Sequence, residues 1–145
     1  TGILTSVCRC FTSEPDGAQS SNMFSFGVQL GKKGPKVELD GSRVSGEGTA
    51  LGVYGIDQDK AYFEVKVVRA GEGFWMAGLA RSTCQDRPKL GGDGDSWVIS
   101  SEQISCQDGD VIGCAYDQSD MPTSLKFFHN GAAVDGAVTG VRGEV

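Results

Sequence analysis

Hydrophobic and polar residues alternate most clearly between residues 62 and 67, where the sequence reads YFEVKV. In an extended chain Phe63, Val65 and Val67 share one face, and the polar residues Glu64 and Lys66 share the other. This period of two predicts a strand that covers a core with one face. Four more short apolar runs, each bounded by Gly, Asp, Asn or Ser, predict strands at Met76 to Ala80, Trp97 to Ser100, Val111 to Tyr116 and Leu125 to His129. No segment of comparable length has the period of a helix.

Two dipeptides between apolar positions predict hairpin turns. Asp40-Gly41 interrupts the run from Lys36 to Val44, and Asn130-Gly131 interrupts the run from residue 127 to 133. Both suit a type I′ turn, which needs positive φ at its two central positions. About five to ten short strands joined by glycine-containing loops predict a β-sandwich or a barrel, and no longer repeat indicates a propeller or a solenoid.

The composition fits a single globular domain of this class. The chain has 145 residues, and its 22 glycines are far above the roughly 7% background. The net charge is -6 and the 13 Lys and Arg residues form no basic stripe, which argues against nucleic acid as a partner. No run of about 18 apolar residues would span a membrane, and no secretory signal is visible.

The five cysteines are expected to be free thiols in a reducing compartment. Cys106 and Cys114 lie in or beside apolar segments, where a reduced thiol behaves as a small apolar residue. Cys8 and Cys10 form a C-x-C pair, but zinc clusters are usually built from C-x2-4-C pairs or histidines. The two-carboxylate loops at residues 93–95 and 108–110 lack the spacing of a calcium-binding EF-hand. We therefore expect no metal and no cofactor.

The single histidine, His129, directly precedes the Asn130-Gly131 turn. With the turn closed, Leu125, Phe127 and His129 project to one face of the strand, so the histidine is a strand-end residue. General-base catalysis needs a nucleophile or carboxylate within about 3 Å of the imidazole. The sequence has neither a G-x-S-x-G elbow nor an H-E-x-x-H motif, and we expect no catalytic residue.

Five short motifs follow one another in order along the chain. They are Tyr62-Phe63-Glu64-Val65, Trp75 to Ala80, Leu90-Gly91 with Ser96-Trp97, Gly109 to Gly113 with Asp117, and Phe128-His129-Asn130-Gly131. Each motif alone is weak, but their order and spacing together are specific. Over residues 36–145 the chain resembles the SPRY domain family.

The resemblance implies an all-β fold, a bent β-sandwich of two antiparallel sheets, that binds other proteins through loops at one edge and is not an enzyme. A rigid sheet scaffold that positions irregular loops is a common source of binding specificity. We expect the SPRY domain at residues 23–145, preceded by an N-terminal segment at residues 1–22 that contains Cys8 and Cys10. The family pattern continues past Gly143 with further strands, so the domain is expected to be incomplete at its C-terminus.

In SPRY proteins, loops at the positions of residues 51–59 and 81–95 build the surface that contacts the partner. Tyr54 would supply rigid amphipathic area, and Arg81 and Arg87 would donate to carboxylates or carbonyls of a partner. The residues expected to accept hydrogen bonds from a bound segment are Asp57, Gln85 and Asp86. The predicted function is recognition of a peptide segment or surface loop of another protein, without catalysis.

Four other residues on the family motifs have structural interpretations. Trp75 and Trp97 are expected in the core. The alternative function, a carbohydrate-binding sandwich, would require an exposed aromatic platform in a concave site. Asp110 and Asp117 flank the strand at 111–116 and are expected to fix turns by accepting backbone hydrogen bonds.

The apolar stretch around Cys8 and Cys10 is the other candidate site. Cysteines flanked by apolar residues near a terminus can be S-acylated, and two acyl chains hold a protein to a membrane where one does not. The alternative is that residues 3–11 pack as a strand. We expect a cytoplasmic protein, with membrane contact only if these two cysteines are acylated.

Overall fold

The structure, a computed structural model, describes residues 4–9, 25–26, 28–57, 59–71, 73–87, 90–92, 94–119, 121–136, 138–142 and 145, with the backbone alone for 4–9 and 25–26. Within these residues the chain forms thirteen strands and one short 3-10 helix, η1 (Ser82–Cys84). The strands are β1 (Leu4–Arg9), β2 (Ser25–Phe26), β3 (Leu30–Lys33), β4 (Val37–Asp40), β5 (Arg43–Gly46), β6 (Ala50–Gly52), β7 (Lys60–Val67), β8 (Met76–Ala80), β9 (Ser96–Ser100), β10 (Val111–Asp117), β11 (Ser124–His129), β12 (Ala132–Ala133) and β13 (Val138–Thr139).

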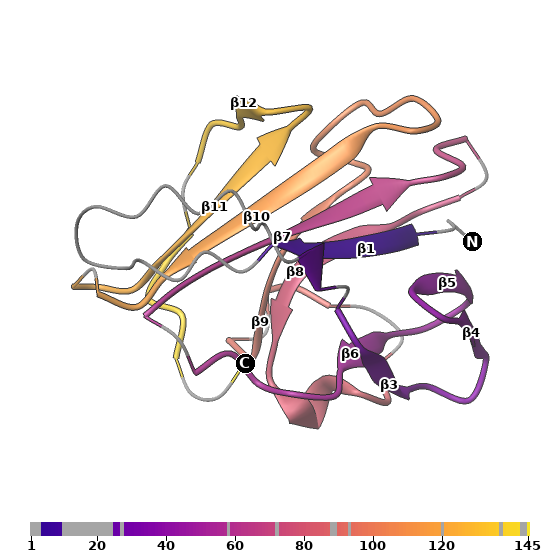
Figure 1. Cartoon of the computed structure of the whole chain (residues 1–145), viewed down its shortest axis with the longest axis horizontal. Coiled ribbons are helices and arrows are strands. Elements are labelled where there is room, and N and C mark those ends of the chain that lie inside the picture. The colour runs from indigo at the N-terminus through magenta and orange to yellow at the C-terminus, as the bar shows by residue number, and fades with distance from the viewer. Residues whose placement is uncertain are drawn as a thin grey trace.

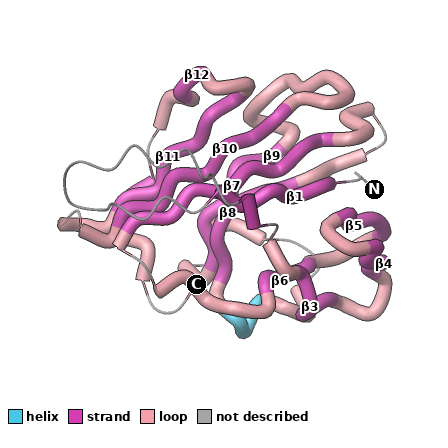
Figure 2. The backbone as a smooth tube through the Cα atoms, in the orientation of Figure 1, coloured by secondary structure: helices cyan, strands magenta, loops and turns pink. Residues whose placement is uncertain are grey.

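The strands form one large antiparallel sheet and two small ones (Figure 1). The large sheet has the order β12-β11-β10-β7-β1-β5-β4, with β13 paired to β11 and β2 paired to β1. The β8–β9 hairpin crosses one face of this sheet, and β3 pairs with β6 (Figure 2). The all-β sandwich predicted from the sequence is therefore confirmed, although β3–β6 and β8–β9 are separate small sheets where one continuous second sheet was expected.

One face of β7, β10 and β11 supplies most of the hydrophobic core. The side chains of Val67, Ile112 and Leu125 are fully buried there, whereas Lys66 on the opposite face of β7 is exposed. The core residues that this face packs against come from the segment entering β8 and from the β8–β9 hairpin: Trp75, Ala77, Leu79 and Ile99. Burial of each large aliphatic side chain contributes about 1.5–3 kcal/mol, so this contact is the main attraction between the layers.

The strand predictions from periodicity are confirmed for all five apolar runs, within one or two residues at each end. The turn at Asn130-Gly131 is confirmed as well. His129 pairs with Ala132, and the two turn residues have φ of 50° and 83°, as a type I′ turn requires.

The other predicted hairpin forms, but its predicted turn is wrong by one residue. Asp40 pairs with Arg43, so the two turn residues are Gly41 and Ser42 rather than Asp40 and Gly41. Only Gly41 has a positive φ, of 60°. A glycine with positive φ at the first central position is the pattern of a type II′ turn.

The expected roles of the aspartates and thiols in the core sheet are confirmed. The backbone N–H of Gln107 donates to Asp110 Oδ2 (2.9 Å), and that of Ser119 donates to Asp117 Oδ1 (2.9 Å). Cys114, like the other two described cysteines, is a free thiol. Burial raises the pKa of the Cys114 thiol far above its usual range, so this cysteine behaves as an apolar core residue.

The N-terminal segment predicted at residues 1–22 contributes β1 to the large sheet. β1 lies between β7 and β5, and its six residues pair with residues 62–67 of β7. The strand alternative is therefore confirmed for the backbone of residues 4–9. The domain boundary at residue 22 stays a prediction.

Gly78 lies in the middle of β8, where the backbone of β9 approaches closely. A Cβ atom at this position would lie 2.1 Å from Trp97 O and 2.8 Å from Val98 Cα. Neither atom can move without separating the paired strands, so the hairpin requires a residue without a side chain here.

We predict that Gly78→Ala lowers the free energy of unfolding by about 1–3 kcal/mol, the usual cost of forcing extra atoms into a packed site. Gly71→Ala is the matched control, because a Cβ there would meet nothing within 4 Å and it should change stability by less than about 0.5 kcal/mol. Urea unfolding of the three proteins measures both effects. Equal midpoints for Gly78→Ala and the parent would contradict the packing account.

Candidate functional site

The loop between β6 and β7, residues 53–59, is held by backbone hydrogen bonds to distant parts of the chain. The N–H of Val53 donates to Gln29 O (2.8 Å), and the N–H of Ile56 donates to Val145 O (2.7 Å). These two bonds fix the loop on either side of Tyr54. The loop is therefore irregular in conformation but anchored at its base.

Among the described residues, four large hydrophobic side chains are exposed, and two of them are aromatic. Tyr54 is the more exposed of these two. It has a relative exposure of 78%, and its neighbour Val53 has 39%. A tyrosine offers a large apolar ring and a hydroxyl that can hydrogen-bond, and it has only two side-chain torsions to fix on binding. Asp57, later in the same loop, is exposed as well.

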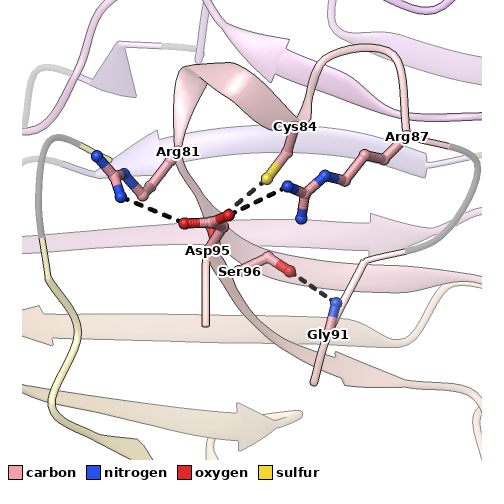
Figure 3. A network of polar contacts seen from close by, with 6 residues as sticks. All are labelled: Arg81, Cys84, Arg87, Gly91, Asp95 and Ser96. Carbon is pink, nitrogen blue, oxygen red and sulfur yellow. Dashed lines mark hydrogen bonds and ion pairs between the residues drawn. The ribbon is translucent and has the colours of Figure 1, made fainter. Parts of the chain in front are cut away.

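The loop between β8 and β9, residues 81–95, is closed by a network centred on Asp95 (Figure 3). The N–H of Arg81 donates to the backbone oxygen of Asp95 (2.9 Å). The Asp95 carboxylate then lies between two guanidinium groups, with Oδ1 3.2 Å from Arg81 Nη1 and Oδ2 3.1 Å from Arg87 Nη2. One carboxylate thus links both arginines that the sequence had suggested for partner binding.

Three further contacts hold the same loop. The Cys84 thiol in η1 donates to the backbone oxygen of Asp95 (3.5 Å), and the N–H of Gly91 donates to Ser96 Oγ (2.6 Å), as Figure 3 shows. The Thr49 hydroxyl donates to Arg87 O (2.6 Å). The last bond connects the loop to the start of β6.

The two loops therefore lie at opposite ends of β6. Thr49, beside Arg87, immediately precedes this three-residue strand, and Val53 follows it. At about 3.3 Å per residue, the backbone from Thr49 to Tyr54 spans at most about 17 Å. A bound peptide segment of a few residues is long enough to contact both loops.

The residues predicted to contact a partner divide into two groups. Tyr54, Asp57 and Asp86 are exposed, and Gln85 is half-buried. Arg81 and Arg87 are paired with Asp95, so in this structure each orients the loop as well as presenting a guanidinium group to solvent. The role of Asp95 was missed, because the sequence suggested the 93–95 loop only as a weak calcium candidate.

Side-chain positions also bear on the weaker sequence hypotheses. Trp75 has a relative exposure of 3% and cannot act as a stacking platform for a sugar, while Trp97 is half-buried against the core. In the 108–110 loop, which was weighed as a calcium candidate, Asp108 Oδ1 accepts a hydrogen bond from Ala70 N (2.7 Å).

The cysteines weighed for acylation are only partly described. Cys8 lies in β1 with its Cα opposite that of Phe63, and Cys10 lies outside the described residues. Acylation of these two cysteines stays a prediction.

His129 has two ionisable neighbours that no sequence motif indicated. Its Nε2 lies 2.8 Å from Asp110 Oδ2 and 3.8 Å from Cys106 Sγ. In a nucleophile relay the thiol and the carboxylate contact opposite ring nitrogens, so that one removes a proton while the other orients the ring. Here both contact Nε2, and the arrangement does not have that geometry.

The protonation of this cluster agrees with a structural carboxylate and an unreactive thiol. Hydrogen bonds from the Gln107 backbone and from the His129 and Asn130 side chains lower the pKa of Asp110 to about 2. Burial, and the nearby charge of Asp110, raise the pKa of Cys106. Because the thiolate is the nucleophilic form, a thiol with a raised pKa is a poor nucleophile at neutral pH.

We predict that Asp95→Asn loosens the 81–95 loop without unfolding the domain. The two ion pairs are partly exposed and contribute about 0.2–1 kcal/mol each, so the free energy of unfolding should fall by about 0.5–1.5 kcal/mol. Tryptic cleavage after Arg81 should become faster. Asp86→Asn in the same loop is the control, and indistinguishable cleavage rates for the two variants would refute the role of Asp95.

Comparison with known families agrees with this architecture. The family model described as the SPRY domain matches residues 60–145, from the start of β7 to the last residue of the chain. No curated protein and no solved structure matches the chain. Among the described residues, no helix is both long enough and apolar enough to cross a membrane. Because the match covers more than half of the 145 residues, the chain belongs to the SPRY domain family.

Proposed function

We propose that this protein is a non-catalytic adaptor that binds a peptide segment or surface loop of a partner protein through its inter-strand loops. SPRY domains are generally protein-interaction modules, which supports this class of function. The observation that carries the proposal is the exposure of Tyr54, 78%, on a loop whose backbone is fixed on both sides of it. Exposed aromatic residues on rigid supports are typical anchors of protein interfaces.

The physical advantage of this arrangement is the low entropic cost of binding. Ordering a flexible loop on association consumes part of the interaction free energy. The hydrogen bonds of Val53 and Ile56 order residues 53–56 before any partner arrives. Tyr54 would then insert into an apolar site of the partner, while Asp57 and Asp86 accept hydrogen bonds at the rim.

The 81–95 loop would contribute more to the specificity of binding than to its affinity. Each guanidinium has five N–H donors in a fixed plane, and Asp95 fixes the orientation of both arginines. A partner carboxylate or carbonyl would therefore meet donors that are already oriented. Gln85, half-buried beside them, would add a short-range polar contact.

We also propose a closer relationship within the family. Within the family the chain resembles SPRY domain-containing protein 7, a small stand-alone member, through its cysteine-bearing N-terminal segment and the step Gly140-Val141-Arg142-Gly143. We place the adaptor in the cytoplasm, with contact to a membrane only through acylated Cys8 and Cys10.

We predict that Tyr54→Ala weakens binding to the partner by about tenfold or more, which corresponds to at least about 1.4 kcal/mol for an interface anchor. The partner is first identified by affinity purification with the full chain, and its dissociation constant is then measured with purified proteins. Because Tyr54 is exposed, its replacement should leave the melting temperature unchanged.

Phe74→Ala is the matched control, provided that it stays folded at the assay temperature. Phe74 has a relative exposure of 41% and follows β7, whereas the 53–59 loop precedes it. The eight-residue strand β7, roughly 23 Å long, lies between the two segments along the chain. The proposal fails if Tyr54→Ala binds the purified partner as tightly as the parent, or if the loss is the same for both variants.

A further inference from the structure

Cys106, Asp110 and His129 form a cluster of three metal-binding side chains at one end of the large sheet. One ligand atom from each residue lies within 4.8 Å of the other two. Cys106 comes from the connection between β9 and β10, Asp110 immediately precedes β10, and His129 is the last residue of β11. Ile112 pairs with both His129 and Val65, so the cluster lies near the C-terminal end of β7. The 53–59 loop enters β7 at its other end, and the cluster is therefore remote from that loop.

The backbone fixes the positions of all three residues independently of any ion. The type I′ turn after His129 sets the register in which that residue pairs with Ile112. The N–H of Val111 donates to Asn130 Oδ1 (2.9 Å), which ties the start of β10 to the same turn. The N–H of Gln107 donates to Asp110 Oδ2 (2.9 Å), which folds the connection containing Cys106 toward the sheet.

The three donor types are those that zinc prefers. Zn²⁺ is bound by cysteine sulfur at about 2.3 Å and by histidine nitrogen and carboxylate oxygen at about 2.0–2.2 Å, in tetrahedral geometry. These bond lengths require ligand atoms about 3.4–3.6 Å apart. Here the nitrogen and oxygen are 2.8 Å apart, the sulfur and nitrogen 3.8 Å apart, and all three ligand atoms lie within 4.8 Å of one another. Shifts of up to about 1 Å would bring them to the distances of a zinc site.

The cluster is accessible from solvent. The side chains of His129 and Asp110 are 27% and 19% exposed, and Cys106 is half-buried. Three protein ligands occupy three tetrahedral positions and leave the fourth for water or for a ligand from outside the chain. On binding, the Cys106 thiol releases its proton to solvent, and His129 binds the metal through an Nε2 atom without a proton, any proton at this atom being released to solvent as well.

We propose that Cys106, Asp110 and His129 form a binding site for a zinc-type divalent cation. The bound ion would join the 101–110 connection to the β10–β11 hairpin and replace the direct His129–Asp110 contact. This inference does not rest on the proposed adaptor function, because none of the three residues belongs to the 53–59 or 81–95 loop.

Titration of the reduced, metal-free full chain with Co²⁺ and Zn²⁺ tests the site. Co²⁺ should bind at one equivalent per chain with a sulfur-to-cobalt charge-transfer absorption, and Zn²⁺ should displace it. His129 is the only histidine, so its ring resonances in an NMR spectrum report on this residue alone. Those resonances should shift and saturate at one equivalent of Zn²⁺. Unchanged resonances at excess Zn²⁺ would overturn the proposal without the need for any variant.

Near-isosteric variants assign the ligands. Cys106→Ser and His129→Gln should each weaken Co²⁺ binding by at least about 10–100-fold. Loss of a residue that only hydrogen-bonds to a metal ligand already lowers metal affinity by this factor. The double variant Cys8→Ser/Cys10→Ser is the matched control, because these cysteines form the cysteine-based metal candidate in the sequence. It should bind Co²⁺ as the parent does. Binding that survives Cys106→Ser, or that disappears in the Cys8/Cys10 variant, would overturn the assignment.

Discussion

Burial of one face of β7, β10 and β11 against the β8–β9 hairpin is the contact on which the rest of the molecule depends. β10 is central to it, since seven of its residues pair with β7 and six pair with β11. The side chains of Ile112 and Leu125 are fully buried between the layers. Because the layers are held by close packing, the positions of the connecting loops at both ends of the strands are determined by the sheets.

The two ends of the sandwich use this support differently. At one end, the 53–59 loop presents Tyr54 to solvent, and the carboxylate of Asp95 holds the neighbouring loop closed. At the other end, the strand register brings Cys106 and Asp110 to the same nitrogen of His129. Because both groups contact the same nitrogen, the cluster lacks the geometry of a catalytic relay and is compatible with the proposed metal site.

Local patterns in the sequence were sufficient for the core strands and insufficient for contacts between distant residues. The alternation in β7 and the apolar run in β10 identify their buried faces directly. β3 (LGKK) is exposed along most of its length and β6 has only three residues, so neither has a readable period. The Asp40-Gly41 turn was misplaced because the dipeptide rule does not specify which residue pair closes the hairpin. Tyr54 was predictable as a loop residue, but its exposure depends on hydrogen bonds to residues 29 and 145.

The central claim is that the sheets hold the two proposed binding loops in fixed positions. Native-state amide hydrogen exchange, followed residue by residue, tests it most directly. The amides of Val53, Ile56, Arg81 and Cys84 each donate to a backbone oxygen, and the account predicts that all four exchange far more slowly than in an unfolded chain. Exchange of these amides at unfolded-chain rates, while the amides of β7 and β10 stay protected, would show that the loops are mobile and would contradict the account.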